Sequence, residues 1–250
     1  CYRDVKDTTA TALFTILDPK EEMTGWGTPC FMAWTTTPWT LPSNTALCVG
    51  PKFEYVAVRT YNPYTADKIT VVMARELVKA YFKPEGEKGD MDSYKKGDKV
   101  LPYRIQGSWK GAELTGMRYE QLMPWVKPLF KVDDNSTKEV KGYAATHPDK
   151  CFSVRNDNFV EAADLAFRVI EGDYVTIDDG TGIVHIAPTF GADDAKVAKA
   201  AGIPSLFMIN LKGETRPMVD FQGKYYLLKD CNETFVEKCV VCSAADVTAF

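Results

Sequence analysis

Residues 34–44 have the sequence Trp-Thr-Thr-Thr-Pro-Trp-Thr-Leu-Pro-Ser-Asn. The apolar and β-branched residues 28–36 predict a strand that leads into this segment. Pro38 has no backbone N–H for a sheet ladder, so we expect the strand to end directly after the Thr run. The hydroxyls of Thr35, Thr36 and Thr37, with the backbone N–H groups freed there, could then bind a carbonyl oxygen or a water. The alternative is a plain strand whose hydroxyls face water or the backbone.

A second polar segment, Gly-Thr-Gly-Ile-Val-His-Ile-Ala-Pro-Thr-Phe-Gly-Ala-Asp-Asp, covers residues 180–194. It predicts a strand that ends at Pro188, then a glycine turn, then a short helix over 193–201 that opens with Asp193 and Asp194. Carboxylates at a helix N-terminus often serve only as caps, and His185 can equally be a hydrogen-bonded core histidine. Binding and structural roles for these side chains are both open at this point.

The other predicted elements alternate irregularly along the chain. Further strands are expected at residues 11–17, 53–59, 69–73, 151–156, 174–187 (strand, turn, strand), 205–210 and 224–228, and short strands with turns over 108–130. Helices are expected at 74–82, at 159–170 and in the tail from residue 232, with polar loops at 83–99 and 133–142. The pattern predicts one α+β domain over residues 1–250, with the tail from about residue 230 unassigned.

Composition narrows the class of protein. The 250 residues are 45% hydrophobic, 12% aromatic and 26% charged, which is typical of a soluble globular chain. Lys and Arg number 30 against 34 Asp and Glu, a net charge of −4. This balance argues against binding nucleic acid mainly by nonspecific phosphate attraction, although local contact with an RNA end stays possible. No apolar run approaches the roughly 20 residues of a membrane span, so no membrane association is expected.

The seven cysteines are odd in number and scattered, and a chain of this size needs no disulfide framework. We therefore expect reduced thiols and a cytoplasmic location. Cys239 and Cys242 form a lone C-x-x-C pair, which is either an incidental pair or a zinc or redox site; a structural zinc site needs a second pair of ligands. The chain begins with Cys1 and not Met, so we expect a processed product or a fragment.

Several common catalytic motifs are absent from the sequence. It contains no P-loop, no G-x-S-x-G elbow and no H-E-x-x-H pair. The two histidines, His147 and His185, lack the spacing of metal ligands, so no metal is expected.

Together, the segments 34–44 and 180–194 resemble the editing domain of isoleucyl-tRNA synthetase. That family carries the same Thr-rich W-T-T-T-P-W-T-L-P strand and the same G-T-G-I-V-H segment that ends in two Asp residues. Shorter matches lie at residues 2–6, 111–116 and 147–148. The related valyl and leucyl domains have T-T-R-P where this chain has 35–38, and they lack His185. The ATP-site signatures H-I-G-H and K-M-S-K-S are absent.

The resemblance implies an α+β fold with a β-barrel-like core and a few peripheral helices. It implies hydrolysis of valine from mischarged isoleucine tRNA, with valyl-adenylate as a second possible substrate. The expected partners are the aminoacylated 3′ end of that tRNA and the rest of the synthetase chain, and the fragment is expected to be monomeric. No cofactor is expected for editing, because ATP, Mg²⁺ and zinc would serve only the parent synthetase.

The resemblance also implies roles for individual residues. Thr36, Thr37 and Asp194 are the expected catalytic residues, and Asp194 would hold the α-ammonium of the substrate. The other expected substrate contacts are Trp34, Thr35, Thr40, Asn44 and His185. His185 would set the size limit for the amino-acid side chain. Trp34 is the weaker candidate, because Trp34 and Trp39 could be plain core aromatics.

No residue is an obvious general base, so hydrolysis would depend on a water positioned by Thr hydroxyls and backbone, with help from the free ribose hydroxyl. An aminoacyl ester is already activated, which makes positioning and oxyanion stabilisation a sufficient mechanism. The alternative is a non-catalytic module of the same fold that grips a tRNA end or a ligand.

Overall fold

The computed structural model describes residues 8–220 and 223–241 of the chain. These residues divide into two compact units. Unit 1 takes 8–38, 47–120 and 168–185, and unit 2 takes 39–46, 121–167 and the described residues from 186 onward. The prediction that residues 1–250 form a single domain stays a prediction.

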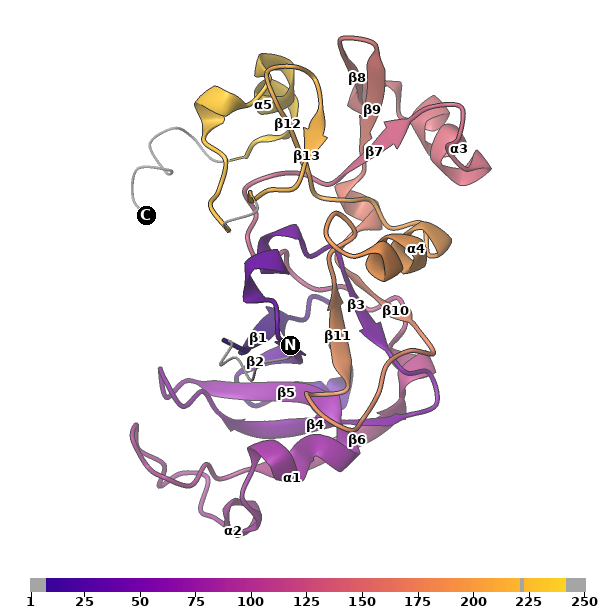
Figure 1. The fold of residues 1–250 in the computed structure, drawn as a ribbon. Helices are drawn as coiled ribbons and strands as arrows, with labels where there is room; N and C mark the ends of the chain where they lie inside the picture. The colour runs from indigo at the N-terminus through magenta and orange to yellow at the C-terminus, as the bar shows by residue number, and fades with distance from the viewer. Residues whose placement is uncertain (1–7, 221–222, 242–250) are drawn as a thin grey trace, which may run out of the picture. The chain divides into compact units, whose positions relative to one another are not determined.

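Unit 1 is built on a five-stranded sheet with the order β1-β2-β5-β4-β6 (Figure 1). Its strands are β1 (Ala10–Thr15), β2 (Thr28–Thr35), β4 (Glu54–Tyr61), β5 (Lys68–Ala74) and β6 (Arg104–Lys110). The pair β2 and β5 is parallel, and the other pairs are antiparallel. The interior strands β4 and β5 are apolar along most of their length because both of their faces are buried.

A smaller sheet of three strands has β3 (Ala46–Val49) between β10 (Arg168–Glu171) and β11 (Ile183–Ile186). Every residue of β3 is buried. Two short helices follow β5 in unit 1, α1 (Val78–Tyr81) and α2 (Pro84–Glu87). Helical turns of the 3-10 type occur at Glu21–Met23, Pro38–Ser43, Arg75–Leu77, Gly111–Leu114, Pro148–Lys150, Ala163–Leu165 and Leu228–Asp230.

Unit 2 combines an antiparallel sheet with three helices (Figure 1). The sheet has β9 (Asp157–Glu161) between β7 (Leu129–Val132) and β8 (Cys151–Val154). The hairpin of β12 (Met208–Ile209) and β13 (Thr215–Arg216) and the helices α3 (Lys138–Thr146), α4 (Ala192–Ala200) and α5 (Glu233–Cys239) complete it. Phe159, Leu129 and Phe235 are almost fully buried and form part of its core.

Mixed sheets and few helices confirm the predicted α+β class. The expected barrel-like core is present only as open sheets, because β1 and β6 are the two edges of the largest sheet and no sheet within the described ranges closes on itself. The strands predicted at 11–17, 28–36, 53–59, 69–73 and 151–156 and the helices at 74–82, 193–201 and in the tail are confirmed to within a few residues.

The helix predicted over 159–170 is wrong. Residues of this segment form the end of β9, a 3-10 turn and most of β10, and Phe167 takes a left-handed backbone conformation with φ of 55°. The Ala-rich sequence favours a helix locally, but β9 pairs with strands on both sides, and sheet pairing outweighs helix propensity here.

Four further expectations need correction. Of residues 174–187, only Ile183–Ile186 form a strand, because Gly180 and Gly182 turn the chain with positive φ before it. The predicted strand at 224–228 reduces to one isolated bridge at Tyr225, and the one at 205–210 to Met208–Ile209. The polar loop at 133–142 ends early, since the Thr137 hydroxyl accepts from the Val140 N–H and caps α3.

Candidate functional site

The Thr run lies where β2 leaves the sheet of unit 1. Thr35 is the last residue of β2, and its buried hydroxyl accepts a 3.0 Å hydrogen bond from the backbone N–H of Thr37. The hydroxyls of Thr35 and Thr37 lie 3.3 Å apart. The N–H that the strand end was predicted to free is therefore satisfied within the turn itself. Thr36 is exposed and Thr37 is half-buried, so these two hydroxyls are the accessible ones.

Thr40 and Asn44 follow in unit 2 and are buried, with 7% and 2% of their surface exposed. The Asn44 side-chain amide donates a 2.8 Å hydrogen bond to the carbonyl of Ala46, and its backbone N–H donates to Leu41. These bonds fix the passage from the 3-10 turn into β3. Asn44 thus has a structural role, and its contact with an adenosine stays a prediction.

Two glycines shape the turn before β11 in unit 1. Gly180 and Gly182 have φ of 67° and 72°, a region that favours glycine. A Cβ on Gly180 would lie 2.9 Å from the ring of Trp34, and one on Gly182 would lie 2.5 Å from the Cβ of Ala74. The half-buried Trp34 therefore packs directly against this turn. Trp39, in contrast, is 44% exposed and is not a core aromatic.

The Tyr55 hydroxyl connects the same turn to Gly50, the residue after β3, through two hydrogen bonds. It donates a 2.6 Å hydrogen bond to the Gly182 carbonyl and accepts one of 2.9 Å from the Gly50 N–H. Burial raises the pKa of Tyr55 to about 12, so the phenol stays protonated and remains a donor. Sequence reasoning missed this residue, because Tyr55 and Gly182 are 127 positions apart and no local pattern connects them.

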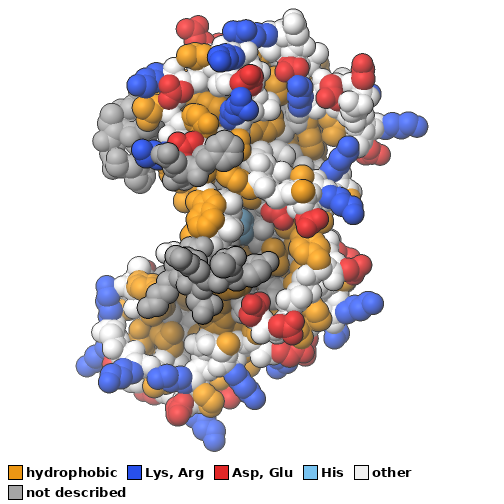
Figure 2. Space-filling model, viewed as in Figure 1, with side chains coloured by type: hydrophobic (Ala, Val, Ile, Leu, Met, Phe, Trp, Pro, Cys, Tyr) orange, Lys and Arg blue, Asp and Glu red, His pale blue; other side chains and the backbone are white. Residues whose placement is uncertain are grey.

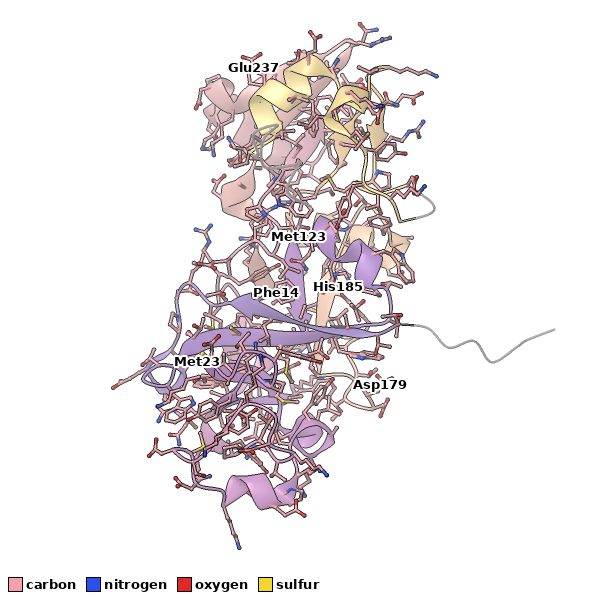
Figure 3. The ribbon with its side chains drawn as sticks, turned by 90° about the vertical axis from the view of Figure 1, so that its left-hand side faces the viewer. Phe14, Met23, Met123, Asp179, His185 and Glu237 are labelled. Carbon is pink, nitrogen blue, oxygen red and sulfur yellow. The ribbon has the colours of Figure 1, made fainter. Side chains whose placement is uncertain are left out.

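His185 lies on β11 and is 7% exposed (Figure 3). Burial lowers the pKa of its imidazole from an ordinary 6.5 to about 4. The ring is therefore neutral at pH 7. A neutral ring suits contact with an apolar side chain and is a weak base.

Asp194 lies in the first turn of α4 in unit 2 and is half-buried. Its Oδ2 accepts a 2.9 Å hydrogen bond from the backbone N–H of Ala187. Burial raises the pKa of Asp194, the Ala187 hydrogen bond opposes this, and Asp193 adds to the rise. The helix N-terminus alone predicts a more acidic group, so burial is the stronger effect here. No described Lys or Arg forms an ion pair with this carboxylate.

Within each unit, the segment from Gly180 to Asp194 lies next to several of the predicted site residues or their neighbours in sequence. In unit 1, Trp34 packs on Gly180, close in sequence to His185. In unit 2, the N–H of Thr45, next to Asn44, donates 3.0 Å to the Ile186 carbonyl, and the following residue Ala187 binds Asp194. The predicted catalytic and binding roles of all eight residues stay predictions.

Among the described residues no cluster of three or more His, Cys, Asp or Glu could hold a metal. Cys30, Cys48, Cys151, Cys231 and Cys239 carry free thiols, and Cys242 lies outside the described residues. Across residues 8–220 and 223–241, we find no helix with the length and apolarity that crossing a membrane requires. On the face drawn in Figure 2, Lys and Arg side chains are interspersed with Asp and Glu.

The chain is 58% identical over 240 residues to an isoleucine–tRNA ligase of Bacteroides thetaiotaomicron, a match that covers 96% of this chain. The chain is similar to one segment of isoleucine–tRNA ligases. It is also 51% identical over 239 residues to the isoleucine–tRNA ligase of Porphyromonas gingivalis, and 31% identical over 242 residues to the cytoplasmic isoleucine–tRNA ligase of Saccharomyces cerevisiae. These matches confirm the resemblance predicted from the two motifs.

The chain spans about a fifth of these isoleucine–tRNA ligases, between 17% and 19% of their length. No family model matches it. Among solved structures, the editing domain of the cytosolic leucyl-tRNA synthetase of P. knowlesi is similar with a TM-score of 0.44 and 12% identity, covering 75% of this chain and 60% of that one.

Proposed function

We propose that this chain is the editing part of an isoleucine–tRNA ligase and hydrolyses the ester that joins valine to the terminal ribose of isoleucine tRNA. Valyl-adenylate is a second candidate substrate. The observation that carries the proposal is the Asp194 carboxylate. This carboxylate is half-buried, is oriented by the Ala187 N–H, and is paired with no described cation. It lies in a chain of which 96% matches a segment of an isoleucine–tRNA ligase.

The α-ammonium group of an aminoacyl ester supplies the cation that Asp194 lacks. A carboxylate whose pKa is raised by burial gains most from such a partner, because an opposite charge stabilises its ionised form. The Ala187 hydrogen bond occupies Oδ2 and leaves Oδ1 for the ligand. Asp193 is exposed at the same helix end and has no comparable orientation by backbone.

The amino-acid side chain would lie against His185. A neutral, buried imidazole can contact an isopropyl group without the cost of desolvating a charge. Its ring lies buried on β11 and would exclude one more methylene. Isoleucine and valine differ by that methylene. Isoleucyl-tRNA synthetase is itself the standard example in which one methylene changes the binding free energy of a pocket by only about 1–3 kcal/mol.

Hydrolysis then needs a positioned water and groups that stabilise the negative charge that develops on the ester carbonyl oxygen. The water oxygen bonds to the ester carbonyl carbon, the bond from that carbon to the ribose oxygen breaks, and the ribose oxygen takes the proton that the water gives up. Valine and uncharged tRNA are the products. The accessible hydroxyls of Thr36 and Thr37 would position the water or the developing oxyanion. We assign no general base, since the imidazole of His185 is too weakly basic.

The proposal is tested by incubating the complete synthetase that carries this chain with Val-tRNA and following the release of valine. The Asp194→Ala enzyme is the matched variant and Asp193→Ala its control. Release of valine that depends on Asp194 supports the deacylase. Binding of Val-tRNA with no release would favour the non-catalytic module of the same fold.

A further inference from the structure

Two turns of unit 2 line a hollow of about 480 Å³ that is open to solvent. One is the turn at Arg155 and Asn156 between β8 and β9, and the other is the loop between β12 and β13. Arg155 joins them: its guanidinium donates a 3.0 Å hydrogen bond to the Leu211 carbonyl, and its stem lies over Gly213, where a Cβ would come within 2.8 Å of Arg155 Cδ.

The Asn210 side chain makes several hydrogen bonds within the loop between β12 and β13. The Asn210 side-chain oxygen accepts from the N–H groups of Lys212 and Glu214 at 2.9 and 3.0 Å, and its amide nitrogen donates to the Glu214 carboxylate. Gly213 takes φ of 84°, which lets the loop turn under Arg155. The backbone N–H of Lys212 is therefore hydrogen-bonded within the loop, and this bond sets the position of the residue.

The charge of the hollow is positive. Its charged lining residues are Lys131, Arg155, Asp157, Lys212, Glu214 and Arg216. Each carboxylate already has a partner: Asp157 pairs with Lys131 at 2.9 Å, and Glu214 pairs with Arg216 at 2.6 Å. Arg155 and Lys212 form no close ion pair with any described carboxylate, although Lys212 helps to lower the pKa of Glu214 at longer range. Four cations thus face two carboxylates, and the excess positive charge can attract an anion.

The backbone of Arg155 is a second sign of function. This residue has φ of 54°, a left-handed conformation that residues other than glycine rarely adopt. Glycine or asparagine would fit that turn position with less strain. Strained positions of this kind are enriched at functional sites, so the arginine side chain is a candidate for a role that the turn itself does not require.

We propose that this hollow binds a backbone phosphate of the tRNA substrate through Arg155 and Lys212. The inference rests on the proposed function. Both side chains are exposed, and exposed charges bind a small free anion weakly. A polyanion that is already held by its aminoacyl end gains from a high effective concentration at the second contact. RNA is therefore favoured over a free phosphate ion, and the net charge of −4 agrees with only a few such contacts.

The test uses the complete synthetase with two substrates, Val-tRNA and the ester of valine with adenosine, which carries no phosphate. Lys212→Glu should lower the ratio of kcat/KM for Val-tRNA to kcat/KM for the small ester by about tenfold, the size of one charge-assisted contact. The loss should appear in KM, and the dependence of log kcat/KM on log salt should flatten by about one. Lys138→Glu, an equal charge change on exposed α3 of the same unit, is the matched control and should leave the ratio intact.

Arg155→Gly separates a binding role from a structural one. Glycine keeps the left-handed turn but removes the guanidinium, so it should lower the same ratio while thermal unfolding shows a folded protein. An unchanged ratio in both Lys212→Glu and Arg155→Gly would overturn the proposal. Inhibition by inorganic phosphate that exceeds inhibition by chloride at equal ionic strength, and that Lys212→Glu abolishes, would identify a small-anion site and overturn the assignment to RNA. If the unaltered enzyme hydrolyses neither Val-tRNA nor the ester of valine with adenosine, the proposed function itself is contradicted.

Discussion

The backbone N–H of Ala187 donates a 2.9 Å hydrogen bond to the Asp194 carboxylate and so connects the residue after β11 to the first turn of α4. This bond orients one carboxylate oxygen while burial raises the pKa of the group. The hydrogen bond thus holds the Asp194 side chain in place, while burial makes its ionised form less stable. A cation from the ligand would relieve that cost, which is a reason to expect Asp194 at the centre of recognition.

Asp194→Ala should lower hydrolysis of Val-tRNA by about tenfold or more, because charge-assisted contacts contribute roughly 1.5–3 kcal/mol. The measurement is kcat/KM for release of valine by the complete synthetase. Asp193→Ala is the control and should have a smaller effect, since Asp193 is exposed. Hydrolysis at the normal rate by Asp194→Ala would show that the ammonium is bound elsewhere.

Asp194→Asn should stabilise the fold at pH 7 although it impairs activity. The raised pKa means that ionisation of Asp194 costs the folded state free energy above that pKa, and asparagine removes this cost while its side-chain oxygen can still accept from Ala187. The gain should shrink as the pH falls through the raised pKa and should vanish below the ordinary Asp value of about 3.9, where the carboxyl is protonated in both states. Thermal unfolding against pH checks this, and a variant less stable than the wild type at pH 7 would contradict it.

His185→Ala should remove the proposed size limit on the amino-acid side chain. Correctly charged Ile-tRNA should then be hydrolysed, while hydrolysis of Val-tRNA persists at least in part. The measurement is deacylation of both tRNAs by wild type and variant. Loss of activity on both substrates would assign His185 a catalytic or structural role, and continued sparing of Ile-tRNA would place the size limit on another residue.

The titration of His185 should be visible in the stability of the fold. Its folded pKa of about 4 lies below the unfolded value of 6.5, so the unfolded chain takes up a proton that the folded chain does not. Stability is therefore fully present above pH 6.5 and is lost as the pH falls toward 4, by up to about 3 kcal/mol at 1.36 kcal/mol per pH unit. His185→Gln should lose this share of the acid sensitivity. Equal pH dependence in both proteins would mean that the imidazole is accessible to protons in the folded state.

Motifs with a fixed local chemistry were predictable from the sequence. Pro38 does end β2 within three residues of Thr35, and Asp193 and Asp194 do open α4. Most of strand β6 was not predicted, because its sequence is largely polar and it has a bulge opposite Val56 and Ala57, next to Gly107 with φ of 65°. Its only large apolar side chains are Ile105 and Trp109, with Gly107 between them, and this is too short an alternation to predict a strand.

The contacts between distant segments that position the candidate site residues could not be predicted from the sequence. The Ala187 N–H is a backbone group that any residue other than proline could supply. Tyr55 looks like one more aromatic residue of a buried strand until its hydroxyl is seen between Gly50 and Gly182. Such contacts depend on which segments the fold brings together, and local patterns hold no information about that choice.

The turn before β11 offers a test of how closely the scaffold is packed. Gly182→Ala must keep φ near 72° and would also place its Cβ 2.5 Å from the Cβ of Ala74, in a turn whose carbonyl is fixed by Tyr55. Gly116→Ala is the matched control, because Gly116 has φ of 87° but no atom within 4 Å of the position that an added methyl group would take. The control should lose about 1–2 kcal/mol from backbone strain alone. Gly182→Ala should lose a further 1–3 kcal/mol or so from overpacking. Denaturant unfolding of both variants measures the difference, and equal losses would mean that β5 moves aside without cost.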